Sequence, residues 1–262
     1  MFLIRPEQIR KEAELRGVPA SQLGVPEVTI LTFNKAVLDE IRSQCGMQEW
    51  QWEGWRFSPY STPLVSLIGN LDDIKVALVI PPMGASPLAA LCHELIHFGT
   101  RALFLLCASW SLGPEYLDKG EIHLPTNAIG IDGTSIHYGN CDEEIGCESS
   151  AFEALAQALD ETNAAWKQGA VGSCEALYRI TPELAMDYRN RGCLSMENGE
   201  AAALYSLARV TKTPIGVLFQ PYIDLTKGWS ASYMDEVYSE TCRVQARAAL
   251  RAIRILNDAH RS

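Results

Sequence analysis

The chain has 262 residues, of which 47% are hydrophobic, and it carries a formal net charge of −10 without any block of lysine or arginine. This length suits one large domain with a substantial core, and the acidic balance argues against nucleic acid or an anionic membrane as a partner. Eight scattered cysteines without a CxxC pair favour reduced core thiols over a disulfide framework. The sequence shows no signal-peptide pattern and no apolar run of membrane-spanning length, so we expect a cytoplasmic protein.

Strand-like and helix-like segments alternate along the chain. Short apolar runs predict strands at 28–33, 64–68, 75–80, 102–108, 121–125 (as an edge strand), 170–174, 193–196 and 214–219. Helical spacing and boundary residues predict helices at 6–16, 35–42, 88–98, 150–168, 182–190, from 200 onward, and at 235–256, with a turn at 132–135 and an acidic loop at 140–149. The order of strand, glycine turn, helix and strand over 75–108 makes a βαβ unit, so part of the sheet is parallel.

Four aromatic residues crowd one segment, namely Trp50, Trp52, Trp55 and Phe57. The alternation of Trp50 and Trp52 fits one face of a strand. We expect core packing for these rings, and exposed tryptophans would instead mark a subunit interface.

A carboxylate stands at the head of the helix that begins at Glu200. Asn198 and Gly199 break the chain between the strand at 193–196 and this helix, and Glu197 lies just before the break. The apolar face of the helix begins with the glutamate itself and continues with Ala203, Leu204 and Leu207. A glutamate that faces a core needs a partner, and open α/β sheets place ligand sites at such strand-to-helix corners. The alternative is a structural cap, in which Asn198 caps the helix and Glu200 favours its first turn.

The segment HELIH matches the HExxH pattern of zinc proteases, with His93 and His97 one helical turn apart and Glu94 between them. The apolar stripe of this helix comprises Leu88, Leu91, Cys92, Leu95, Ile96 and Gly99. The three motif residues therefore fall on the other side, as a solvated face would. Glu115 or Glu121 would have to supply a third ligand, and no recognisable motif does so, so we expect no metal site and keep a zinc hydrolase as the remote alternative.

The order of elements and four sequence pieces resemble the nucleoside phosphorylase and uridine phosphorylase family from residue 28 onward. The pieces are 83–87 (MGASP) with the helix that ends at 99, 119–121 with 132–138 (KGE and DGTSIHY), 172–184 (GSCEALYRITPEL) and 197–205 (ENGEAAALY). The resemblance implies a three-layer α/β/α fold with a mixed, twisted central sheet, in a single domain over 1–262 whose residues 1–26 form a helical extension.

The resemblance also implies cleavage of the bond between ribose C1′ and the base of a nucleoside. Positive charge builds on the sugar in an oxocarbenium-like transition state, so a carboxylate close to the ribose hydroxyls helps. The departing base needs an acid, and a nucleophile, which is phosphate in the family, must attack C1′.

By position, Glu200 matches the ribose-binding glutamate of the family, and one inserted residue makes Glu197 a second candidate. Met196 is the third ribose-binding candidate. Asp224 lies near the Ser-Asp acid of the family, although it is about one residue out of step and the serine is missing. We therefore predict Glu200 and Asp224 as catalytic, with a cap of the turn before Gly228 as the structural alternative for Asp224.

The base is expected to contact Leu177, Tyr178 and Ser109. Tyr178 has core packing as its alternative. The Gln/Arg pair with which pyrimidine-specific phosphorylases read the base is not found, which favours a purine.

The sequence departs from the family most at the phosphate site. The glycine-rich loop with its arginine is replaced by 32–35 (TFNK), and Leu105 stands where a second arginine is expected. Arg56 matches the arginine that a neighbouring subunit lends, and Gly84 lies in the glycine turn, so both are phosphate-binding candidates. Lys35 and Ser109 could partly compensate. Because a single arginine binds a phosphate dianion weakly, both phosphorolysis and hydrolysis remain possible reactions at this stage.

Three hypotheses follow: a nucleoside-cleaving enzyme, a member of the same fold that binds a nucleoside without cleaving it, and the zinc hydrolase. We expect no cofactor, phosphate as the one candidate co-substrate, a small-molecule nucleoside as the ligand, and a homo-oligomer (dimer, trimer or hexamer). The tryptophan-rich segment around Arg56 is a candidate for the subunit contact.

Overall fold

The first of two six-stranded sheets is mostly parallel. The computed structural model describes residues 2–140, 143–147 and 149–261. In spatial order the strands are β11 (Ile215–Leu218), β5 (Ala102–Leu106), β1 (Val28–Thr32), β4 (Ile74–Ile80), β3 (Val65–Leu71) and β2 (Gln48–Glu49). The first four run parallel, and β3 and β2 add antiparallel pairings. Every residue of β1 is buried, as expected for a strand covered on both faces.

The second sheet continues from the first. Its spatial order is β12 (Pro221–Asp224), β6 (Ser109–Ser111), β10 (Cys193–Glu197), β9 (Trp166–Cys174), β7 (Ile122–Ile131) and β8 (Glu144–Gly146). The chain passes from β5 directly into β6 and from β11 directly into β12, and a bridge between His123 and Phe219 adds a third connection. The expected central sheet is therefore two joined mixed sheets.

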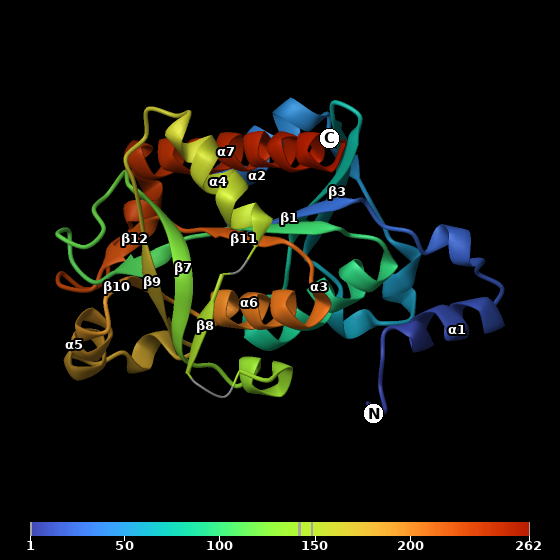
Figure 1. Ribbon diagram of the computed structural model, residues 1–262, viewed down its shortest axis with the longest axis horizontal. Helices are drawn as coiled ribbons and strands as arrows, with labels where there is room; N and C mark the ends of the chain where they lie inside the picture. The colour runs from blue at the N-terminus through green and yellow to red at the C-terminus, as the bar shows by residue number, and fades with distance from the viewer. Residues whose placement is uncertain (1, 141–142, 148, 262) are drawn as a thin grey trace.

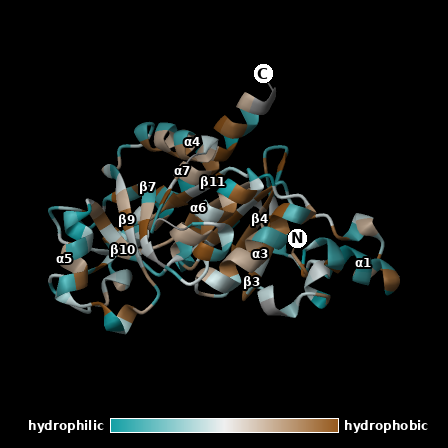
Figure 2. Ribbon diagram, turned by 60° about the horizontal axis from the view of Figure 1, so that its bottom comes forward, coloured by the Kyte–Doolittle hydropathy of each residue, from teal (hydrophilic) through white to brown (hydrophobic). Residues whose placement is uncertain are grey.

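Helices cover both faces of the first sheet and confirm the three-layer α/β/α architecture (Figure 1). One layer contains α2 (Lys35–Cys45), α4 (Ser150–Asp160) and α7 (Glu236–Arg261), and the other contains α3 (Ala85–Phe98) and α6 (Glu200–Thr211). α5 (Pro182–Asn190) packs beside β10, and α1 (Glu7–Leu15) lies at the opposite end of the molecule. The strands carry mostly hydrophobic residues, whereas α1 and α5 are largely hydrophilic (Figure 2). Among the described residues, none of the helices has the length and apolar character to cross a bilayer.

Three predicted elements differ from the structure. The strand predicted at an edge over 121–125 lies inside the second sheet, where β7 pairs with both β9 and β8. The helix predicted over 150–168 ends at Asp160, because the chain from Trp166 pairs with β7 as β9. Within the predicted acidic loop, Glu144–Gly146 forms β8, and residues 141, 142 and 148 lie outside the described residues.

The aromatic segment after β2 forms a small core of its own. Trp52 and Trp55 are buried together with Leu23 of the N-terminal segment and Phe98 of α3. The Trp52 indole N–H donates to the Leu23 carbonyl at 2.8 Å. Core packing is therefore confirmed, but Trp52 follows β2 in irregular chain and Trp55 lies in a short 3₁₀ helix (Glu53–Arg56), so the two rings do not share a strand face.

Candidate active site

A cavity of about 780 Å³ lies at the carboxyl ends of β1, β5 and β10. Its wall includes Asn34 after β1, Cys107 after β5, and Glu197 at the end of β10. The first turns of α6 and α7 complete it, with Glu200 and Tyr238 facing the space. Ligand sites of α/β proteins form at this edge, because the loops that follow parallel strands converge there.

Two carboxyl groups share one side of this cavity. Glu197 and Glu200 are only 2% and 4% exposed. One oxygen of Glu197 accepts a hydrogen bond from the Ser173 hydroxyl, and the other accepts from the Ala201 N–H at 3.3 Å. The Glu200 carboxylate accepts from the Asn198 side-chain amide at 3.3 Å. Both carboxyls are thus buried, anchored and directed to the same space.

The two carboxyls differ in their environment. Burial raises the pKa of the Glu197 carboxyl well above its usual range, and the neighbouring Glu200 carboxylate raises it further. The hydrogen bonds from Ser173 and Ala201 oppose this shift but do not cancel it. Glu197 therefore keeps its proton under conditions in which an ordinary glutamate is ionised. A neutral acid and a second carboxyl side by side form a pair suited to proton transfer.

Gly199 allows both carboxyls to reach the cavity. It has φ +91°, in the left-handed region, and it joins β10 to α6 at the corner between the two glutamates. A Cβ atom at this position would lie 3.0 Å from Cγ of Glu175 and 3.1 Å from Cβ of Asp132. The break read from the sequence is therefore a tight turn that only glycine fits without strain.

An aromatic wall faces the same cavity. Trp110 of β6, Tyr222 of β12 and Tyr233 from the loop before α7 contribute rings, and Leu177 adds an aliphatic side chain. The rings of Tyr222 and Tyr233 have centroids 6.4 Å apart. Such a wall can stack against a flat, heterocyclic ligand group.

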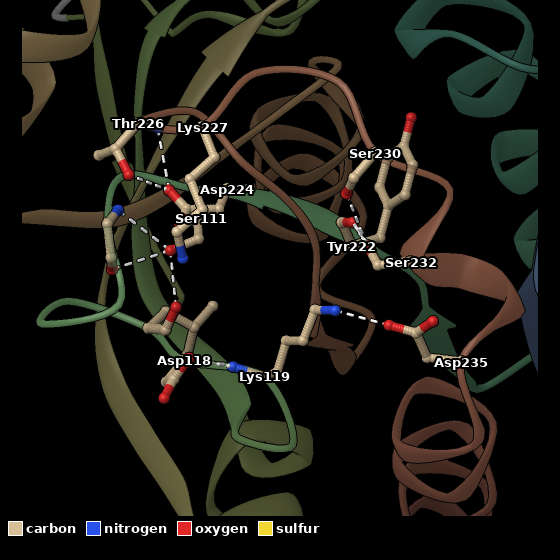
Figure 3. Close-up of polar contacts among 12 residues, drawn as sticks. Ser111, Asp118, Lys119, Tyr222, Asp224, Thr226, Lys227, Ser230, Ser232 and Asp235 are labelled. Atoms are coloured by element: carbon tan, nitrogen blue, oxygen red, sulfur yellow. Dashed lines mark hydrogen bonds and ion pairs between the residues drawn. The ribbon is translucent and has the colours of Figure 1, made fainter.

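The segment that carries Tyr233 is anchored on both sides of this residue (Figure 3). The Ser232 hydroxyl donates to the backbone carbonyl of Tyr222, and the Lys119 ammonium pairs with Asp235 at 2.6 Å. The second contact ties the turn before β7 to the residue before α7. These two contacts thus fix the position of Tyr233 in the wall.

The cavity lining also contains polar residues, and its cations already have partners. Lys35 pairs with Asp39, and the Arg243 guanidinium pairs with Glu240 at 2.8 Å and with Glu236 at 3.2 Å. Among the described lining residues there is no further lysine or arginine. The Asn34 amide nitrogen is buried there without a hydrogen-bond partner in the described structure. The described lining therefore offers no unpaired cation.

The structure brings three of the predicted site residues to the cavity, namely Glu197, Glu200 and Leu177. Met196 is fully buried in the core behind it, and Ser109 is buried with its hydroxyl near the Gln220 carbonyl. Tyr178 is 87% exposed and borders a separate hollow beside α5. Its core alternative is therefore wrong.

The phosphate candidates do not line the cavity. Arg56 pairs with Glu53 at 2.7 Å and borders a neighbouring groove along Trp50. Gly84 precedes α3, and the adjacent Met83 takes the place on the cavity wall. Lys35 does line the cavity, although its ammonium is held by Asp39.

Asp224 lies outside the cavity wall. Its carboxylate accepts hydrogen bonds from the Thr226 N–H at 2.9 Å and the Thr226 hydroxyl at 2.6 Å, and it pairs with Lys227 at 2.8 Å (Figure 3). These contacts close the turn after β12. The structure thus matches the turn-capping alternative and does not bring Asp224 to Glu200.

The HExxH helix also differs from the expectation. Glu94 is buried, and its carboxylate accepts from the hydroxyls of Ser58 and Ser61 at 2.5 and 2.6 Å. The glutamate is therefore a structural anchor for the segment before β3 and not part of a solvated face. Among the described residues, no three His, Cys, Asp or Glu side chains are grouped so that they could hold a metal ion.

Two joined sheets with a carboxyl pair and an aromatic wall at their strand ends define an α/β protein with a built small-molecule site. The family model of the phosphorylase superfamily matches residues 59–257, and the chain belongs to this superfamily. The resemblance drawn from the sequence is therefore confirmed. No curated protein matches the chain by sequence.

Two examples illustrate the likeness of the fold to solved structures. Purine nucleoside phosphorylase from Toxoplasma gondii in complex with immucillin-H is 15% identical, with a TM-score of 0.75 over 92% of this chain and 94% of that chain. AMP nucleosidase from Bacteroides thetaiotaomicron is 17% identical, with a TM-score of 0.68 over 96% of this chain and 98% of that chain. At this level of identity the likeness establishes the fold, and the chemistry must be argued from the cavity itself.

Proposed function

We propose that the protein cleaves the N-glycosidic bond of a nucleoside and that water is the acceptor of the sugar. The observation that carries the proposal is the buried pair of Glu197 and Glu200 in a cavity with an aromatic wall. A carboxylate beside the sugar stabilises the positive charge that develops at C1′ in an oxocarbenium-like transition state. Glu200, at the start of α6, is the residue that we assign to this role.

The choice of water follows from the charges around the cavity. A phosphate dianion needs several arginine or lysine donors, and such contacts are strongest when the cations are free to pair with it. Here Arg243 is engaged by two glutamates and Lys35 by Asp39. Leu105, where the resemblance leads us to expect an arginine, is a fully buried core residue of β5. Hydrolysis needs none of these cations.

We assign the base to the aromatic side of the cavity. Trp110 and Tyr222 contribute aromatic rings to its lining, and the cavity falls in the size range of sites that enclose small organic ligands. A bicyclic purine gains more stacking area on such a wall than a pyrimidine does. We therefore propose purine nucleosides as the preferred substrates.

The test is the release of free base from a panel of purine and pyrimidine nucleosides. The reactions are run in buffers with and without phosphate, and chromatography measures the free base. We expect release at the same rate in both buffers, with purines cleaved faster. Release that requires phosphate would assign phosphorolysis instead, and ligand binding without release would indicate a non-catalytic binder.

The first variant to compare is Glu200→Ala, for which we expect at least a 10³-fold loss of kcat, equal to about 4 kcal/mol of transition-state stabilisation. Glu94→Ala is the matched control, because Glu94 is also a buried, hydrogen-bonded carboxyl but lies outside the cavity wall. Unchanged turnover in the Glu200 variant, with normal cooperative unfolding, would move the reaction to another site.

A further inference from the structure

The departing base needs a proton, and few groups around the cavity can supply one. Negative charge accumulates on the base as its bond to C1′ breaks, so a positioned acid accelerates the step by about 10²- to 10⁴-fold. Asp224, which the sequence suggested for this role, is held by Thr226 and Lys227 in the turn after β12. Of the carboxyls that line the cavity, Asp39 is paired with Lys35. Glu197 and Glu200 are therefore the remaining carboxyls of the lining that could act as the acid.

We propose that Glu197 is the general acid that protonates the departing base, and that the Glu197–Glu200 pair then recovers this proton from the attacking water. The inference rests on the proposed hydrolysis of a nucleoside. It assigns to the end of β10 a role that the sequence placed after β12.

The hydrogen bonds of Glu197 leave its proton facing the pair or the cavity. The Ser173 hydroxyl donates to one carboxyl oxygen and the Ala201 N–H donates to the other, so neither group is an acceptor for the Glu197 proton in this arrangement. The remaining neighbour is Glu200, across the corner formed by Gly199. Because burial raises the pKa of Glu197, this carboxyl is protonated before the substrate reacts.

The proposed reaction balances within the cavity. The C1′–N bond breaks, its electron pair stays with the base, and the base nitrogen takes the proton from Glu197. Water forms the new C1′–O bond and gives one proton to the carboxylate pair, which returns to its starting state. The products are the free base and the free pentose, and no further reactant is needed.

The decisive experiment compares two kinds of substrate in the Glu197→Gln variant. A purine nucleoside has a leaving group that needs a proton, whereas 4-nitrophenyl β-D-riboside has one that leaves as a stable anion. We expect Glu197→Gln to lose about 10²- to 10⁴-fold in kcat on the nucleoside and less than about 10-fold on the nitrophenyl riboside. Glu200→Gln should lose activity on both, and Glu94→Gln on neither.

A pH profile supplies a second readout. Because the acid must be protonated, kcat/KM should fall as the pH rises through the pKa of Glu197. The Ser173 hydroxyl stabilises the ionised form of Glu197, so Ser173→Ala should raise this pKa and move the alkaline limb to higher pH. A merely structural role of Ser173 would lower the rate without moving the limb.

The outcomes separate the two proposals. Two results of Glu197→Gln would exclude Glu197 as the acid: retained nucleoside hydrolysis, or an equal loss of kcat on both substrates. An alkaline limb that does not move in Ser173→Ala would exclude it too. In each case the proposed function stands. If the wild-type protein cleaves no nucleoside, both proposals fail together. Thermal unfolding of each variant excludes misfolding as the cause of a loss.

Discussion

The Tyr238 hydroxyl donates a hydrogen bond of 2.7 Å to the side-chain oxygen of Asn34, which links the first turn of α7 to the residue before α2. Asn34 occupies the cap position of α2, yet its side chain makes no capping bond to that helix. The tyrosine instead fixes the side chain of Asn34, which lines the cavity and whose amide nitrogen is buried without a partner in the described residues. Burial raises the pKa of Tyr238, so the phenol remains a donor at neutral pH.

Tyr238→Phe should weaken catalysis without unfolding the protein. The substitution removes one hydrogen bond, typically worth about 1 kcal/mol, so we expect a fall in kcat/KM of about 5- to 10-fold, through a higher KM for the nucleoside. Steady-state kinetics measures the effect, and Tyr116→Phe, which lies outside the cavity wall, is the control. Identical KM and kcat in the Tyr238 variant would show that the Asn34 amide does not meet the substrate.

Gly199→Ala should disturb both stability and catalysis. The left-handed backbone costs a residue with a Cβ about 1–2 kcal/mol, and the new methyl would crowd Glu175 and Asp132, so the corner that carries Glu197 and Glu200 must shift. We expect the free energy of unfolding in urea to fall by about 1–3 kcal/mol and kcat/KM to fall by at least about 10-fold.

A matched control is available at Gly192. This glycine also has positive φ, +81°, but nothing lies within 4 Å of the position of a Cβ atom. Gly192→Ala should lose stability through the backbone alone and keep its kcat/KM. Equal kinetic losses in the two variants would mean that the corner geometry at Gly199 has no special importance for the carboxyls.

Local periodicity was enough to find most of the fold. The helix predicted over 182–190 has the bounds of α5, since Pro182 fixes its start and the Thr181 side chain caps it. β6 and β12 could not be found this way, because they are three and four residues long and owe their strand conformation to pairing with each other and with β10. Which segments pair over such distances is not encoded in any short window.

The carboxyl pair could also be read from the sequence, because an acidic residue heading an apolar helix face is a local signal. Most of the other residues of the cavity wall could not be predicted from the sequence. Trp110, Tyr222 and Tyr238 meet only because β5 and β11 continue into the second sheet and α7 returns over the first. The misplacement of Asp224 has a local cause, since Thr226 and Lys227 satisfy the carboxylate two and three residues later.

Asp224→Asn should therefore leave catalysis nearly unchanged. The asparagine oxygen can still accept from Thr226, and the lost ion pair with the 73% exposed Lys227 is worth at most about 1 kcal/mol. We expect kcat/KM within about 2-fold of the wild type across the pH profile. A loss above 100-fold with a changed alkaline limb would restore Asp224 as the acid and contradict the assignment to Glu197.

A buried histidine ties the strands beneath the carboxyl pair together. One ring nitrogen of His123, Nε2, lies 3.1 Å from the Gly169 carbonyl, and the other, Nδ1, lies 3.0 Å from the Ser195 hydroxyl, two residues before Glu197. A carbonyl can only accept, so Nε2 carries the hydrogen and Nδ1 accepts from Ser195. This arrangement needs the neutral imidazole, and burial lowers the pKa of His123 to about 4.

The stability of the protein should therefore depend on pH through His123. An unfolded histidine has a pKa of about 6.5, so between pH 6.5 and 4 the unfolded state binds a proton that the folded state does not. The contribution is fully present above pH 6.5 and is lost as the pH falls through this window, by up to about 3 kcal/mol. Urea unfolding at several pH values should show a shallower slope for His123→Gln than for the wild type, whereas the exposed His137→Gln should follow the wild type. Parallel slopes for all three proteins would mean that His123 accepts a proton in the folded state as readily as in the unfolded chain.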